Sequence, residues 1–147
     1  MGVLDLRNEA DAYSKLRQIY DTVTEVCKTY HGTEMALESP FYGKNAQVIL
    51  KLGRAQGAAM LAALEYGITS VHEYAPREAK QAITGNGAAS KEQVSMMLRK
   101  TLDVDFRPEH LDATDALAIA LCHYYSITSP LAKVKGPAAG RSSSRII

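Results

Sequence analysis

The spacing of apolar residues along the chain predicts a protein built mainly from helices. Between Tyr13 and Tyr30 apolar side chains recur every three or four residues, which is the repeat of a helix with one buried face. His31-Gly32 is expected to end this helix. A longer helix is expected from Lys44 to about Glu65, ended by Gly67. Three shorter helices are expected over residues 76–83, 91–102 and 113–125.

Three short segments are expected to be strands. They cover Val3–Leu6, which alternates weakly, and residues 34–38 and 68–74. Ser39-Pro40 is expected to stop the second strand. Strands that alternate with helices indicate the α/β class. Three strands are few, however, for a sheet with this many helices.

Local signals mark the starts of two helices and an unusual helix interior. Ser90 and Gln93 form a capping box, and Asp112 is expected to cap the last helix. The helix expected over 44–65 is rich in glycine and alanine. Each glycine costs about 1 kcal/mol relative to alanine in a helix. Gly53 and Gly57 therefore predict that another element packs very close to this helix.

Composition indicates an ordinary globular domain. Of the 147 residues, 46% are hydrophobic and 22% are charged, which excludes a wholly disordered or collagen-like chain. The net charge of +1 gives no sign of nucleic-acid binding. Cys27 and Cys122 fit no disulfide or zinc pattern and are expected to be buried free thiols. With no signal-peptide pattern or membrane-length apolar stretch, a cytoplasmic protein without membrane contact is expected.

Three acidic residues stand out by their positions. Glu38 ends an expected strand, where α/β sheets form ligand sites, and Asp112 and Asp115 share one face at a helix start. Carboxylate oxygens are the ligands that Mg²⁺ prefers, so the three can converge on a divalent cation. The alternative is ordinary helix capping and dipole chemistry for the aspartates, with Glu38 a solvated charge at a strand end.

One block of sequence reads Leu-Glu-Ser-Pro-Phe-Tyr-Gly-Lys-Asn, and three more blocks follow it, so that together they span most of residues 35–125. In their residues and in their order, the four blocks resemble the RuvC family of bacterial Holliday-junction resolvases. The Pro-Phe-Tyr-Gly-Lys-Asn and Ala-Ile-Thr-Gly-Asn-Gly segments are similar to the Bacteroidetes-like branch. The four blocks cover residues 37–45, 50–57, 74–94 and 111–118.

The resemblance implies a ribonuclease-H-like fold, a mixed five-stranded sheet flanked by helices. It implies a homodimer that binds a four-way DNA junction and cuts two strands by Mg²⁺-dependent hydrolysis during recombination and repair. Two Mg²⁺ ions are expected in the complete family site, with Mn²⁺ as a possible substitute. The bacterial branch-migration proteins RuvA and RuvB are the implied protein partners.

Three of the family's four acidic metal ligands transfer to this sequence, namely Glu38, Asp112 and Asp115. The fourth comes from an Ile-Asp-Pro-Gly-like strand end, and the sequence contains no Asp-Pro-Gly. Met1 matches a point just before the family's third strand, so the first two strands are expected to be absent. We expect one N-terminally incomplete nuclease domain over 1–128, inactive and poorly folded alone, and a disordered basic tail over 129–147.

The resemblance also implies DNA contacts. Lys80 and Lys91 occupy family positions near the scissile phosphate, where a lysine can neutralise transition-state charge. Phe41, assisted by Tyr42, is expected to stack on bases near the junction centre. From the residues alone, a solvated lysine beside a capping box is the favoured interpretation of Lys91, and Phe41 can equally be a core residue. Phosphate contacts are expected from Lys44, Arg54 and Arg77.

The glycine-rich helix lies at the dimer interface in the family, so Gly53 and Gly57 are expected there. Close packing on the chain's own sheet is the alternative. Two other functions stay open. One is another ribonuclease-H-like nuclease, against which the Phe41 loop and residues 85–91 argue. The other is a non-catalytic junction-binding fragment, which would bind junctions without cutting them across a Mg²⁺ titration.

Overall fold

The computed structural model describes residues 2–39, 45–103 and 111–129, with residues 111 and 112 described by their backbone only. Five helices and two strands lie in this part of the chain. Their order is α1 (Ala12–Tyr30), β1 (Glu34–Glu38), α2 (Ala46–Tyr66), β2 (Ser70–Tyr74), α3 (Pro76–Thr84), α4 (Lys91–Leu102) and α5 (Leu111–Thr128).

The helix ends follow from capping side chains and left-handed residues. The Asp11 carboxylate accepts hydrogen bonds from the first backbone N–H groups of α1. His31 ends that helix at a φ of 52°, and Gly67 ends α2 at a φ of 105°. The predicted capping box of Ser90 and Gln93 is confirmed at the start of α4. The last helix begins at Leu111, so the prediction that Asp112 caps it is wrong. Asp112 lies inside the first turn instead.

The two strands pair in parallel, with Glu34 opposite Ser70 and Glu38 opposite Tyr74. Side chains alternate between the faces of a sheet. Residues 34, 36, 38, 70, 72 and 74 therefore share one face. The predicted strand at Val3–Leu6 is wrong, because residues 2–6 form no ladder with either described strand. Weak alternation does not make a strand without a partner for its backbone groups.

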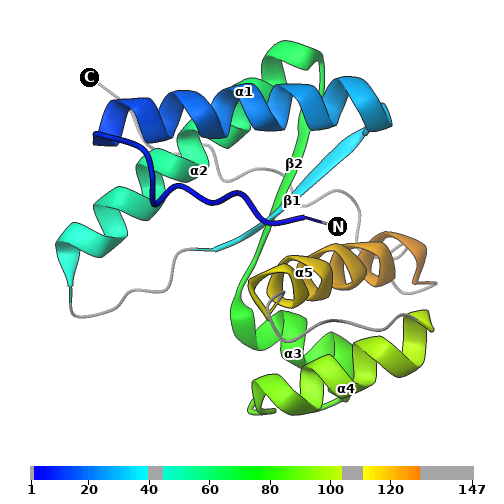
Figure 1. Ribbon diagram of the computed structural model, residues 1–147. Helices are drawn as coiled ribbons and strands as arrows, with labels where there is room; N and C mark the ends of the chain where they lie inside the picture. The colour runs from blue at the N-terminus through cyan, green and yellow to red at the C-terminus, as the bar shows by residue number, and fades with distance from the viewer. Residues whose placement is uncertain (1, 40–44, 104–110, 130–147) are drawn as a thin grey trace, which may run out of the picture.

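The helices form a layer on each side of this strand pair (Figure 1). Helices α1 and α2 lie on one side, and α3, α4 and α5 lie on the other. Each layer has its own core. Cys27 and Ile68 lie in the α1–α2 core, and Leu98 and Cys122 lie in the α3–α5 core. Both cysteines are buried and free, as predicted, and burial raises the pKa of the Cys122 thiol.

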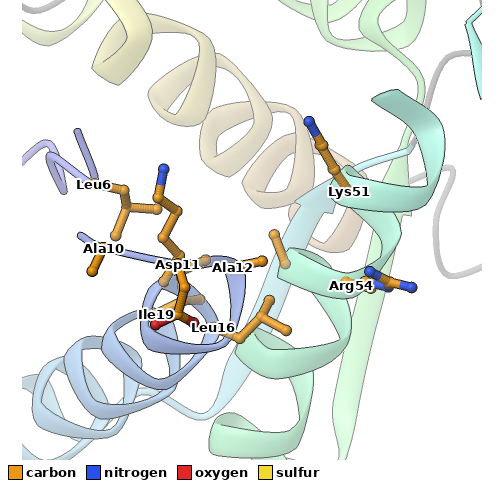
Figure 2. A pocket seen from close by; sticks show the side chains of 10 residues that line it. Leu6, Ala10, Asp11, Ala12, Leu16, Ile19, Lys51 and Arg54 are labelled. Carbon is orange, nitrogen blue, oxygen red and sulfur yellow. The ribbon is translucent and has the colours of Figure 1, made fainter. Parts of the chain in front are cut away.

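Helix α2 presents an open face to solvent. At Gly53 and at Gly57 an added Cβ would meet nothing within 4 Å, so these glycines do not pack closely on the chain's own sheet. Where it packs near α1, α2 also borders a cavity of about 450 Å³. Figure 2 shows this cavity between residues 6–12, α1 and α2, with Lys51 and Arg54 coming from α2.

Two further sequence predictions concern the C-terminal tail and membrane-spanning segments. The disordered tail predicted over 129–147 lies outside the described residues, apart from Ser129. In the described part of the chain, none of the helices has the length and apolar character needed to cross a bilayer.

Candidate active site

Two predicted metal ligands meet where β1 ends. Glu38 is the last residue of β1, and Asp115 lies in the second turn of α5, which covers the same face of the strand pair. Both carboxylates line a cavity of about 340 Å³, together with Lys80 of α3 and Lys91 of α4. The structure thus brings four of the five predicted catalytic residues to one cavity. The fifth, Asp112, lies three residues before Asp115 on α5, and its side chain is outside the described part.

The charges in this cavity are partly paired. The Lys91 ammonium lies 2.8 Å from the Asp115 carboxylate, and both side chains stay partly open to solvent. Lys91 reaches Asp115 from the first position of α4, which the Ser90 capping box fixes. The prediction of a solvated lysine beside a capping box is therefore incomplete, because Lys91 also forms this ion pair.

The electrostatics around Glu38 favour an added cation. Partial burial raises the pKa of the Glu38 carboxyl, the negative charge of Asp115 raises it further, and the positive charge of Lys91 opposes both. Two like charges beside one cavity repel each other unless a positive group comes between them. Carboxylate oxygens are hard donors, which is the set that Mg²⁺ takes. The residues present therefore fit a divalent cation of this kind.

One positioning residue was not predicted. The Gln56 side-chain amide of α2 donates a hydrogen bond of 2.5 Å to the backbone carbonyl of Glu38. On the neighbouring strand, the Tyr74 carbonyl accepts from the Ser39 backbone N–H at 2.8 Å. These two bonds hold the end of β1 from both sides. Gln56 lies inside the second sequence block, in which only the glycines carried a prediction.

The predicted DNA-contacting residues are spread over three regions. Arg54 is exposed on α2 and lines the cavity of Figure 2, away from Glu38. Arg77 is exposed near the start of α3 and packs against Gly87, where an added Cβ would lie 2.7 Å from Arg77 Cγ. Lys80 and Lys91 line the Glu38 cavity. The remaining three, Phe41, Tyr42 and Lys44, lie outside the described residues.

Known proteins resemble this chain in sequence and in fold. The family model described as crossover junction endodeoxyribonuclease RuvC matches residues 1–123. The RuvC of Christiangramia forsetii is 50% identical over 126 residues, which are 86% of this chain and 65% of the relative. The RuvC of Porphyromonas gingivalis is 50% identical over 141 residues, covering 94% of this chain and 74% of the relative.

A solved structure agrees with these relatives. Thermus thermophilus RuvC in complex with a Holliday junction substrate superposes with a TM-score of 0.77 at 35% identity, covering 86% of this chain and 76% of that one. The chain thus spans about two thirds to three quarters of the length of the proteins it matches. On the family match, the relatives and the shared fold, this chain belongs to the RuvC family of crossover junction endodeoxyribonucleases.

Proposed function

We propose that this chain acts on four-way DNA junctions in the bacterial cytoplasm as the nuclease domain of a resolvase used in recombination and repair. The observation that carries this proposal is the convergence of Glu38, Asp115, Lys80 and Lys91 on one cavity. Two carboxylates and two lysine ammonium groups at one strand end suit a metal-assisted attack on a phosphodiester. The junction-bound Thermus thermophilus relative supports the choice of substrate.

The roles of the residues follow from their charges. Glu38, Asp112 and Asp115 would hold Mg²⁺ or Mn²⁺, which when bound activates water and stabilises the leaving oxygen. Lys91, at the first position of α4, would neutralise charge that develops on the phosphate, beside backbone N–H groups that also favour an anion. Lys80 would do the same from α3. Phe41 and Tyr42 would stack on junction bases, and Lys44, Arg54 and Arg77 would contact phosphates.

The 147 residues carry three of the four expected ligands, because they contain no Asp-Pro-Gly. Two-metal hydrolysis of a phosphodiester needs enough carboxylates to hold two ions, and we propose that the missing aspartate would supply one of them. We therefore propose that this chain alone holds a cation weakly and binds junctions without cutting them. The second candidate function, junction binding without cleavage, rests on this same observation.

Pairing of two chains is proposed through α2. Leu50, Gly53, Gly57, Leu61 and Leu64 recur at helical spacing along one face, and the three leucines are 55%, 50% and 48% exposed. The glycines leave room for a second helix to approach closely. A two-fold dimer built on this face would present two identical sites to a two-fold junction. RuvA and RuvB are proposed as further partners on family membership alone.

The test compares the chain with a chimaera that carries the first two strands of a full-length RuvC relative ahead of Val3. With Mg²⁺, we expect the chimaera to cut a synthetic four-way junction and the chain to bind it without cutting. Glu38→Gln in the chimaera should abolish cutting and spare binding. The control is Glu73→Gln, which removes the same charge from the other face of the strand pair. Equal cutting by the chimaera and by its Glu38→Gln variant would reject the proposed site.

A further inference from the structure

A second cluster of ligand-type side chains lies at the opposite end of the same sheet face. It consists of Glu34, His72 and His123, whose ligand atoms all lie within 4.8 Å of one another. The Glu34 carboxylate oxygen Oε2 lies 2.9 Å from His123 Nε2 and 3.5 Å from His72 Nε2. The two imidazole rings are tilted by 37° to each other, with centroids 4.6 Å apart.

The fold itself brings these residues together and keeps them apart from the candidate active site. Glu34 and His72 lie on the face that α5 covers, and α5 runs antiparallel to β1 because Asp115 meets Glu38 while His123 meets Glu34. Glu38 is four positions along β1 from Glu34, about 13 Å. Along α5, His123 is eight positions from Asp115, about 12 Å. The cluster is therefore a separate site.

The donor chemistry selects the ion. Two imidazole nitrogens and one carboxylate oxygen are a Zn²⁺ ligand set, with water in the fourth position, whereas Mg²⁺ prefers oxygen alone. Zinc bonds of about 2.0–2.1 Å in a tetrahedron place neighbouring ligand atoms about 3.3 Å apart. The separations of 2.9 and 3.5 Å from the Glu34 oxygen lie on either side of this value, and all three ligand atoms lie within 4.8 Å of one another. Side-chain rotations would bring the three atoms to the spacing that the ion needs.

The surroundings orient His123 as a ligand. It is only 8% exposed, and its Nδ1 lies 2.8 Å from the hydroxyl of Tyr74, which in turn lies 2.7 Å from Ser126 Oγ. When an ion displaces the proton that Nε2 shares with Glu34, a hydrogen bond from Nδ1–H to that hydroxyl directs the Nε2 lone pair at the ion, the usual arrangement around metal-bound histidines. His72 Nε2 also lies 2.9 Å from Ser70 Oγ, a contact that the ion would replace.

We propose that Glu34, His72 and His123 form a Zn²⁺ site that ties both strands to the C-terminal half of α5. The ion replaces the shared proton of the glutamate–histidine hydrogen bond and joins three elements that are distant in the sequence. Bound only by the folded chain, it stabilises that chain by mass action. This stabilising effect does not depend on the proposed nuclease activity.

Metal uptake by the tag-free chain tests the site, with Zn²⁺ followed by equilibrium dialysis and Co²⁺ by its visible absorption. We expect one ion per chain, tetrahedral Co²⁺ bands and a melting temperature raised by Zn²⁺. His72→Phe and Glu34→Gln should each weaken binding at least about tenfold. Two variants should bind as the unchanged chain does.

The first of these controls is Glu38→Gln, which removes a carboxylate from the candidate active site and not from the cluster. The second is His31→Asn, which removes an imidazole at the end of α1 and keeps a residue that tolerates the left-handed conformation there. Absence of Zn²⁺ uptake by the chain would overturn the proposal. Undiminished uptake by His72→Phe and Glu34→Gln would overturn it as well, whatever the nuclease tests show.

Discussion

The Lys91 ammonium lies 2.8 Å from the Asp115 carboxylate, inside the cavity that Glu38 also lines. The positive charge of this lysine side chain thus already lies where the two carboxylates converge. Lys91 partly offsets the repulsion between Glu38 and Asp115, as its opposing effect on the Glu38 pKa indicates. A divalent ion that binds these acids must share Asp115 with Lys91 or displace it.

Replacing this lysine should therefore separate metal binding from catalysis. Lys91→Met removes a positive charge beside the carboxylates, so the chain should bind Mn²⁺ more tightly in a calorimetric titration. In the chimaera, the same change should slow junction cutting by about 10²–10³-fold, the cost of losing one group that stabilises transition-state charge. Lys100→Met, at the other end of α4, is the control. Weaker Mn²⁺ binding by Lys91→Met would contradict this counter-ion role.

The pH dependence of the melting temperature should show that the fold destabilises the ionised form of Glu38. Its pKa is raised, mainly by burial, so the folded chain favours the protonated form. The stability that this group contributes is present at pH values below its unfolded pKa and is lost as the pH rises through its folded pKa. Above that range, Glu38→Gln should melt about 1–3 °C higher than the unchanged chain, a small shift because the side chain is only partly buried.

The measurement is the melting temperature of both chains between pH 4 and pH 8, with a chelator present. The two curves should meet at the acidic end and separate towards neutral pH. Glu73→Gln controls for a general effect of net charge. Parallel curves for the unchanged chain and Glu38→Gln would show that Glu38 is not destabilised in the fold.

The open face of α2 gives a prediction about pairing. An added side chain at Gly57 meets nothing within 4 Å, so Gly57→Ala should stabilise the helix by about 1 kcal/mol. Gly57→Leu should fit the single chain equally well but hold a second helix away. Sedimentation equilibrium should then show dimerisation weakened by at least about tenfold in the leucine variant, with folding unchanged by circular dichroism. Unaltered self-association would place the dimer interface elsewhere.

Local sequence signals predicted the elements whose ends depend on single residues. The Ser90 capping box and the stop at His31-Gly32 are both confirmed, because capping needs only neighbours in the chain. The predicted strand at Val3–Leu6 is wrong because a strand also needs a partner for its backbone groups. The meeting of Glu38 with Asp115 came from family motifs, since spacing alone favoured ordinary helix capping over a metal site.

The cluster of Glu34, His72 and His123 could not be predicted from the sequence. Glu34 begins a strand, His72 lies within another strand, and His123 lies near the end of a helix, so no short motif joins them. Only the parallel register and the antiparallel course of α5 bring their side chains together. A contact that depends on tertiary packing of three elements leaves no periodic trace in the sequence.

The core beneath the candidate active site is the last feature to be tested. Leu98 of α4 is fully buried, at 0% exposure, in the cluster that joins α3, α4 and α5. Leu98→Ala should lower the free energy of unfolding by about 2–5 kcal/mol in urea denaturation, because it removes packed methyl groups and leaves a cavity. Met96→Ala, on the same helix but 62% exposed, should change it by less than about 0.5 kcal/mol. Since α4 carries Lys91 and α5 carries Asp115, loosening this core should also weaken their ion pair. Equal losses in both variants would mean that α4 does not pack as described, and the site built on it would have to be reconsidered.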